Sequence, residues 1–185
     1  MNPMKVFAAL GEAGMVVTDS PGIAKMVRAL RYHGAPDRVN SRYVSFNGRL
    51  DTLQAAILLK RLAYQNRFVK HRRAAARYYS ENLKGVVTTP RDEKNYFDIY
   101  YTYMIRAARR DALKEFLATR GIESRVHHPL LMPGHQTFRN NGRGSWPVGT
   151  RLIRESLCLP IHEKISRAEQ DAVISAVTDF TNGSG

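Results

Sequence analysis

The segment Phe46-Asn47-Gly48-Arg49-Leu50-Asp51-Thr52-Leu53-Gln54-Ala55-Ala56 leads into the longest helix that the sequence predicts. One helix face continues from it at alternating steps of four and three, through Leu58, Leu62, Gln65, Val69, Arg72, Ala76, Tyr79 and Leu83. Gly85 then marks its end. A helix over 51–85 is longer than is usual in globular proteins, so we expect it to connect two lobes or to pack on a second subunit.

The region before this segment predicts a strand followed by a helix. Met15-Val16-Val17-Thr18 is a short run rich in β-branched residues, which favours a buried strand. Ser20-Pro21 fits an N-cap and a first helical position, and Gly34 fits a C-terminal cap. The helix between them carries its apolar residues on one face: Ile23, Met26, Val27 and Leu30.

The region after the long helix predicts a small α+β unit. Residues 86–98 are polar and rich in turn formers, so we place a lobe boundary there. An alternating strand follows, with Ile99, Tyr101, Tyr103 and Ile105 on one side, and both tyrosines are interpreted as core residues. The remaining expected elements are a helix over 111–120, with Leu113, Phe116 and Leu117 inward, a strand over 122–126, and helices over 147–156 and 166–180, the last with a capping box at Ser166 and Glu169.

Composition excludes several classes of protein. The 185 residues are 43% hydrophobic and 24% charged, which is typical of a folded protein and not of a disordered chain, collagen or a coiled-coil rod. No apolar run approaches the roughly 18 residues of a membrane span, and Met1–Leu10 is a poor signal peptide, so we expect a cytoplasmic protein. The single cysteine, Cys158, excludes an internal disulfide, and no residue cluster has metal-ligand spacing.

The net charge of +13 favours anionic partners. The cationic residues are scattered, with the densest cluster at Lys70-His71-Arg72-Arg73, and no nucleic-acid-binding motif accompanies them. A solvated basic face, or one that meets a phosphorylated small molecule, is therefore favoured over nucleic-acid binding, which stays an alternative.

Lys5 lies between the irregular Asn2-Pro3-Met4 and the apolar run Val6–Leu10. Apolar surroundings disfavour the charged form of an amine and make it a usable nucleophile. The other interpretation is an exposed lysine near a chain terminus, and these residues alone favour it.

Three blocks of the sequence resemble one enzyme family. Pro3-Met4-Lys5, with Ala8–Gly14 and Val16–Asp19, is similar to the segment around the Schiff-base lysine of the DegT/StrS-type sugar-nucleotide aminotransferases. Arg31-Tyr32-His33-Gly34 and the segment from Phe46 to Ala56 are similar to the family's motif Asn-x-Arg-Leu/Met-Asp-x-x-Gln-Ala-Ala and the residues before it. Gly121–Pro129, followed by His135 and by Leu159-Pro160, resembles the family's Gly-Ile, strand and His-Tyr-Pro segment.

The resemblance implies the aspartate-aminotransferase fold, an α/β fold, and pyridoxal 5'-phosphate as cofactor. Residues 1–50 would be a remnant of the cofactor-binding large domain, 51–85 a long connecting helix, and 86–185 the small α+β C-terminal domain. We therefore expect the C-terminal portion of such an enzyme, beginning just before the lysine, with exposed apolar faces that depend on a partner.

The resemblance also implies roles for single residues. Lys5 would bind the cofactor covalently and carry the proton between the donor and the cofactor. Asn47 would reach the cofactor phosphate of the neighbouring subunit, so the site would be shared across a homodimer. His127, His128 and His135 would line the substrate side, with structural histidines as the alternative.

Three further features qualify these roles. Arg49 and Asp51 are expected to form a structural pair or a helix cap. Ser45 replaces a family glycine, and His128 replaces the tyrosine of the His-Tyr-Pro segment.

The implied reaction is amino transfer, with glutamate as donor, to a nucleotide-linked keto-sugar. Lysine at position 5 favours transamination, because members that remove a hydroxyl group can carry histidine there. The chain would act as a homodimer or together with a missing N-terminal part. The alternative is a catalytically inactive remnant, or a dimerisation fragment that folds against an intact paralogue.

Overall fold

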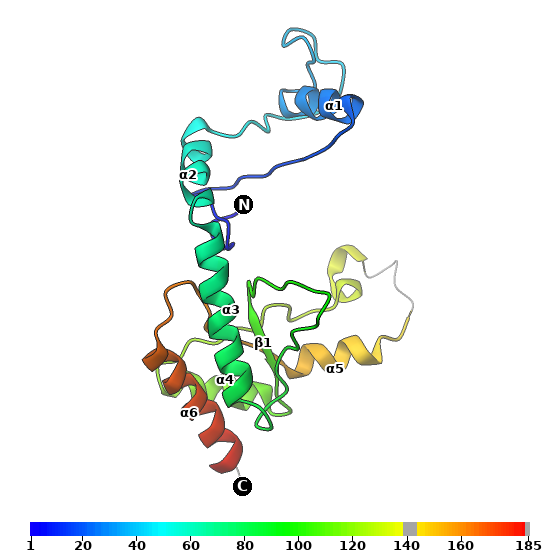
Figure 1. Cartoon of the computed structure of the whole chain (residues 1–185). Helices are drawn as coiled ribbons and strands as arrows, with labels where there is room; N and C mark the ends of the chain where they lie inside the picture. The colour runs from blue at the N-terminus through cyan, green and yellow to red at the C-terminus, as the bar shows by residue number, and fades with distance from the viewer. Residues whose placement is uncertain (139–143, 184–185) are drawn as a thin grey trace. The chain divides into compact units, whose positions relative to one another are not determined.

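The long helix of the sequence is present in the computed structural model as two helices, α2 (Thr52–Leu62) and α3 (Gln65–Asn82) (Figure 1). A turn at Ala63 and Tyr64 separates them, where the Tyr64 amide donates to the carbonyl of Arg61 at 2.9 Å. The structure describes residues 1–138 and 144–183, and the chain divides into the compact units Met1–Asn66 and Arg67–Gly185. The prediction of one uninterrupted helix is therefore wrong, because α2 belongs to the first unit and most of α3 to the second.

The first unit contains α1 (Pro21–Arg31) and α2. Ser20 is the N-cap of α1, as predicted, since its hydroxyl accepts from the Ile23 amide at 3.4 Å. The strand predicted at Met15–Thr18 is wrong: no described strand pairs with this segment, and Val16 and Val17 are 62% and 83% exposed. A β-branched run forms a strand only when a neighbour supplies hydrogen bonds.

A tight loop after α1 folds back along the helix end. His33 and Gly34 have φ values of 53° and 70°. A Cβ atom at Gly34 would lie 1.9 Å from the carbonyl oxygen of Tyr43, so only glycine fits there. The Gly34 carbonyl accepts from the Arg42 amide at 3.0 Å. Tyr32 and Asn47 then pair in an antiparallel bridge, which returns the chain to the end of α1.

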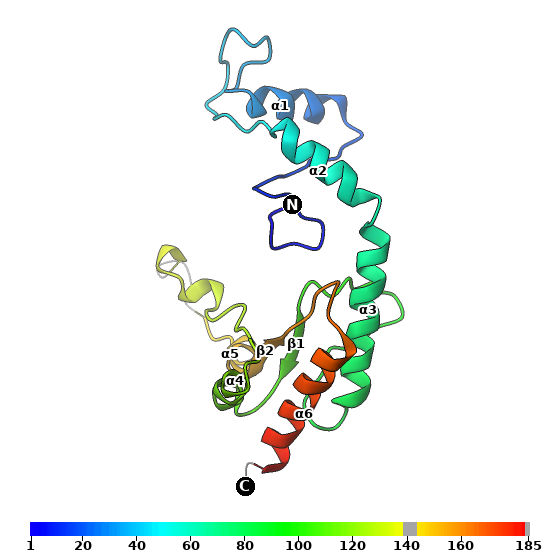
Figure 2. The same cartoon turned by 90° about the vertical axis from the view of Figure 1, so that its left-hand side faces the viewer.

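The second unit is a helical layer around a two-stranded antiparallel sheet. Strand β1 (Tyr103–Arg106) pairs with β2 (Ser156–Leu159), with Tyr103 opposite Leu159. The other elements are α4 (Arg110–Thr119), the 3-10 turns η1 (Met132–Gly134) and η2 (Gln136–Phe138), α5 (Pro147–Glu155) and α6 (Arg167–Gly183) (Figure 2). Its core is formed by fully buried side chains: Tyr79, Leu83, Tyr103, Ile105, Leu113, Leu117, Leu157 and Val177. None of the helices that the structure describes is long and apolar enough to cross a membrane.

The strand predictions for this unit are only partly right. Tyr103 and Ile105 lie in β1 and are buried, as expected. Tyr100 has a φ of 50°, which breaks the alternation, so Tyr100 is 4% exposed whereas Ile99 is 37% exposed. Tyr101 therefore lies outside the strand and is half-buried, contrary to its interpretation as a core strand residue.

The second predicted strand, over 122–126, is wrong. Only Arg125 from this range pairs with the sheet, in an isolated bridge to Cys158. The strand that pairs with β1 is 156–159, whose four residues are too few to show periodicity before the fold is known.

The helix predictions for this unit are confirmed within one to three residues at each end. Leu113 and Leu117 are buried and Phe116 is half-buried in α4, and Gly121 follows with a φ of 71°. The capping box before α6 is present, with the Ser166 amide donating to Glu169 Oε2 at 2.7 Å.

The predicted lobe boundary does not coincide with the compact units. Residues 86–98 belong to the second unit, where Val87 pairs with Lys84 and Thr88 pairs with Arg106. The units meet instead between Asn66 and Arg67, inside α3. The domain ranges 1–50, 51–85 and 86–185 remain predictions.

Arg72, one of the two polar residues on the predicted helix face, is buried in the second unit and hydrogen-bonded there. Its Nη1 atom donates to the carbonyls of Tyr100, Tyr101 and Ile161 at 3.0, 3.3 and 3.2 Å. Its Nη2 atom lies 3.4 Å from the carboxylate of Glu163. One guanidinium thus ties the chain before β1 and the chain after β2 to α3.

The buried Tyr103 makes the unfolding free energy depend on pH in the alkaline range. Burial raises the pKa of Tyr103 from 10.0 to about 12, although a 2.8 Å hydrogen bond with Ser80 opposes the rise. Because the unfolded state gives up this proton first, the stabilising contribution is complete below pH 10 and is lost as the pH rises to about 12. We expect Tyr103→Phe to flatten the fall in unfolding free energy over this range, measured by urea titration at several pH values. The exposed Tyr96→Phe should leave the slope unchanged, and an equal slope in both variants would contradict the assignment.

Candidate functional site

Lys5 lies in an N-terminal segment that α2 holds in place. Gln54 Oε1 accepts from the amides of Leu10 at 2.9 Å and Gly11 at 3.1 Å, and the carbonyl of Val6 accepts from Arg61 at 3.5 Å. Gln54 therefore has a structural role that sequence reasoning did not assign, although its motif was recognised.

The structure leaves the side chain of Lys5 exposed. The apolar residues beside it, Val6, Ala8 and Ala9, are buried. The structure therefore shows an exposed lysine near the chain terminus, which was the other interpretation of this segment.

Asn47 is fixed by its neighbours at the end of α1. Its Oδ1 atom accepts from Arg49 Nε at 2.9 Å and from the Arg49 amide at 3.3 Å. Within the described residues, the amide hydrogens of the Asn47 side chain have no acceptor, so they are available to a ligand oxygen. Lys5 and Asn47 are held by different parts of the first unit, the N-terminal segment along α2 and the loop beyond α1 (Figure 2).

The predicted pairing of Arg49 with Asp51 is wrong for the described residues. The Arg49 guanidinium lies 5.1 Å from the centroid of the Tyr32 ring and hydrogen-bonds Asn47. Asp51 occupies the N-cap position of α2, but its side chain makes no capping hydrogen bond.

The structure brings two of the three candidate histidines together. The His127 ring meets the His128 ring edge-on at 4.4 Å between centroids, and it meets the Tyr101 ring at 5.7 Å. His135 is exposed at the end of η1, and no ring contact joins it to the other two in the part of the chain that the structure describes. Burial raises the pKa of the neighbouring Cys158 thiol, which makes it a poor nucleophile.

Two hollows lie outside these clusters. The first, here called the basic hollow, has a volume of about 320 Å³ and is lined by Lys25, Arg28, Ala29, Arg31, Tyr32, Ala35, Pro36, Arg38 and Arg49. It shares Arg49 with the surroundings of Asn47, so it belongs to the same part of the first unit. In the sequence, the net charge of +13 was noted but the cationic residues were described as scattered, and this group of five was not identified.

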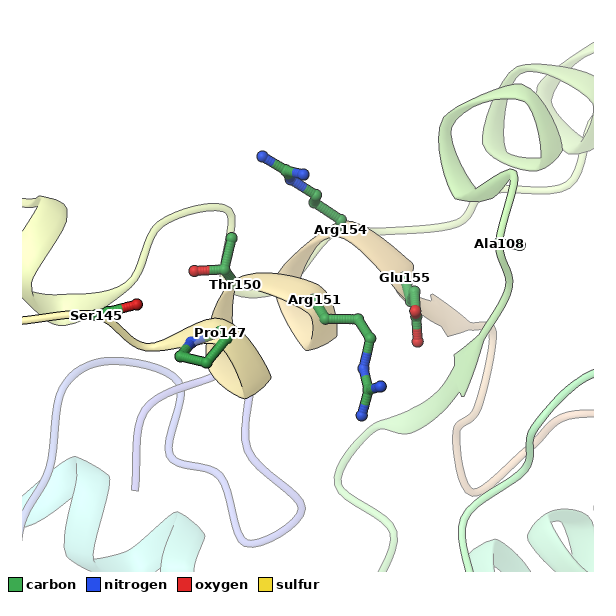
Figure 3. A pocket seen from close by; sticks show the side chains of 7 residues that line it. All are labelled: Ala108, Ser145, Pro147, Thr150, Arg151, Arg154 and Glu155. Carbon is green, nitrogen blue, oxygen red and sulfur yellow. The ribbon is translucent and has the colours of Figure 1, made fainter.

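The second hollow, in the second unit, has a volume of about 540 Å³ (Figure 3). Arg151 and Arg154 of α5 line it, but their side chains point in different directions (Figure 3). Glu155 also lines it and lies 3.9 Å from Arg106. Its charged groups do not converge, so it has no evident ligand chemistry.

The model of the DegT/DnrJ/EryC1/StrS aminotransferase family matches residues 1–178. The chain belongs to this family. Members of the DegT/DnrJ/EryC1/StrS family are pyridoxal-phosphate-dependent aminotransferases, so the family expected from the three blocks is confirmed, together with its cofactor.

Similar proteins cover this chain almost completely. A UDP-N-acetyl-3-dehydro-alpha-D-glucosamine 3-aminotransferase of Acidithiobacillus ferrooxidans is 33% identical over 178 residues, which is 95% of this chain and 47% of that protein. A pleiotropic regulatory protein of Geobacillus stearothermophilus is 30% identical over 184 residues, which is 96% of this chain and 50% of that protein. A DegT/DnrJ/EryC1/StrS aminotransferase structure from Brucella abortus has a TM-score of 0.91 at 30% identity, over 97% of this chain and 49% of its own. The chain thus spans about half the length of the relatives it matches.

These comparisons confirm the mixed α/β class and leave the arrangement of domains a prediction. The structure shows a contact for Ser45, the residue expected from the resemblance to replace a family glycine. The Ser45 hydroxyl donates to the Leu30 carbonyl at 2.6 Å, so it fastens the segment before Asn47 to the last turn of α1.

Proposed function

We propose that this chain is part of a pyridoxal-phosphate-dependent enzyme that transfers an amino group, with glutamate as donor, to a nucleotide-linked keto-sugar. The observation that carries the proposal is the match of residues 1–178 to the family model. The role of Lys5 rests on the resemblance of its segment to the segment around the family's Schiff-base lysine. The Acidithiobacillus relative, whose name specifies a UDP-linked keto-sugar, supports this substrate class.

The residues present fit two parts of the cofactor. Lys5 has a primary amine for its aldehyde, and the free amide hydrogens of Asn47 suit a phosphate oxygen. Pyridoxal phosphate, when bound, supplies the electron sink that stabilises charge on the α-carbon of the amino donor. Lys5 Nζ would then hold the proton taken from that carbon and return it at the cofactor.

The surface of the first unit supports a requirement for further polypeptide. Its buried apolar residues are few and mostly small: Val6, Ala8, Ala9, Ala29, Ala35 and Leu58. Large apolar side chains are exposed in the same unit, among them Met15, Val16, Val17, Ile23 and Phe46. We propose that polypeptide equivalent to the other half of the relatives covers this surface, and that the active enzyme is a homodimer in which Asn47 serves the neighbouring subunit. The substrate-side roles of His127, His128 and His135 remain part of this proposal.

Covalent labelling tests the function. The chain is incubated with pyridoxal phosphate and then borohydride, alone and together with the part of the Acidithiobacillus relative that the match does not cover. We expect mass spectrometry of the combined sample to find the reduced label on Lys5, because a positioned amine reacts ahead of scattered surface lysines. Lys94→Arg serves as the matched control and should leave the label in place.

The alternative is that the chain has no catalytic activity and serves only to dimerise with an intact relative. A label spread over surface lysines, together with a stable complex between the chain and a full-length relative, would favour that alternative and overturn amino transfer through Lys5.

A further inference from the structure

The basic hollow gathers five cationic side chains from three separate segments. Lys25, Arg28 and Arg31 lie on α1, Arg38 lies in the loop after it, and Arg49 lies before α2. Among the residues that the structure describes, no carboxylate lines the hollow, whose other residues are Ala29, Ala35, Pro36 and the half-buried Tyr32. The sequence around it, from residue 21 to 49, has six cationic residues and one acidic residue.

These five charges are not neutralised by the protein. Across residues 1–138 and 144–183, none of them forms an ion pair with an acidic side chain. The acidic residue within the range, Asp37, is engaged elsewhere: its carboxylate lies 3.8 Å from Arg42 and accepts from the amides of Val39 and Asn40 at 3.0 and 2.8 Å.

The dipole of α1 accounts for only part of the cluster. Arg28 and Arg31 stand in the last helical turn, where cations are favourable. Lys25 precedes that turn, and neither Arg38 nor Arg49 belongs to the helix.

Two of the arginines lie near the Tyr32 ring. The guanidinium carbons of Arg38 and Arg49 lie 5.7 and 5.1 Å from its centroid. The like charges that line one hollow repel one another, and a bound anion would relieve that repulsion.

We propose that the basic hollow binds the diphosphate group of a nucleotide-linked ligand. A volume of about 320 Å³ suits a small molecule rather than a folded macromolecule. Guanidinium groups bind phosphate oxygens in bidentate pairs, and five cations in one hollow favour a multiply charged diphosphate over a singly charged carboxylate. The choice of a compact polyanion rests on the uncompensated charge, whereas the choice of a diphosphate rests on the proposed function.

Calorimetric titration of the full chain with inorganic pyrophosphate tests this site. We expect saturable binding, and we expect the double variant Arg28→Gln with Arg31→Gln to weaken it at least about tenfold, since it removes two charge-assisted hydrogen-bond donors. Both side chains are exposed, so the fold should persist, which circular dichroism checks. The variant Arg28→Lys with Arg31→Lys keeps the charges and should retain most of the affinity.

Matched controls distinguish binding at this site from nonspecific attraction of anions to a positively charged protein. Arg77→Gln with Arg67→Gln removes the same charge at exposed positions of α3 and should change the affinity less than about twofold. Equal losses in both double variants, equal competition by sulfate at the same ionic strength, or binding of duplex DNA that pyrophosphate does not displace would each overturn the proposal. If Lys5 is labelled but pyrophosphate does not bind, the diphosphate site is refuted and the proposed function stands. If pyrophosphate binds but Lys5 is not labelled, amino transfer through Lys5 is refuted and the anion site stands.

Discussion

Replacing Lys5 by alanine is expected to lower the amino-transfer rate of the complete enzyme by on the order of 10³-fold or more. Under the proposed function, the substitution removes both the amine that would bind the cofactor and the group that would move the proton. Formation of 2-oxoglutarate from glutamate measures the rate, with the chain joined to the part of the relatives that it does not span.

Two further variants make this result specific. Lys5→Arg keeps the positive charge but not a nucleophilic amine, so it should be as inactive as Lys5→Ala. Lys94→Arg alters an exposed lysine of the second unit and should retain the full rate. A Lys5→Ala enzyme within tenfold of the original rate would show that this amine is not the catalytic one.

Replacing Arg72 by methionine is expected to lower the unfolding free energy by about 3 kcal/mol. Arg72 is 7% exposed, and loss of its guanidinium would leave the carbonyls of Tyr100, Tyr101 and Ile161 without this donor. It would also leave the Glu163 carboxylate without a cation at 3.4 Å. Methionine fills similar space but donates no hydrogen bond, so the desolvated oxygens are not compensated.

Urea titration followed by circular dichroism measures this change. Arg77→Met, an exposed position five residues further along α3, is the matched control and should change the free energy by no more than about 0.5 kcal/mol. Arg72→Lys should lie between the two, because one ammonium reaches fewer of the four acceptors. Equal unfolding free energies of the Arg72→Met and Arg77→Met variants would mean that the buried contacts of Arg72 do not stabilise the fold.

The helices were largely readable from the sequence because their signals are local. Ser20 as N-cap, the Ser166–Glu169 capping box and the apolar spacing of Leu113 and Leu117 act within one or two turns. The strands were harder, since β2 is defined by a partner distant in sequence and the positive φ of Tyr100 has no local signal. Met15–Thr18 shows the opposite error, a strand-like composition without a neighbour to pair with.

For the candidate site, too, some features could be predicted from the sequence and others needed the structure. The resemblance of the blocks around Lys5 and Asn47 to the aminotransferase family could be recognised in the sequence, because a motif is a property of consecutive residues. The structure alone showed that Arg49 orients the Asn47 amide and that Gln54 holds the segment of Lys5.

The sequence by itself thus determined the family, the places of most helices and the candidate cofactor residues. Only the tertiary structure decided where the second strand lies, how Arg72 is satisfied and that five cations from three segments meet around Tyr32. The physical reason is that helix caps and periodicity depend on neighbours along the chain. Strand pairing, buried hydrogen bonds and charge clusters depend instead on residues that only folding brings together.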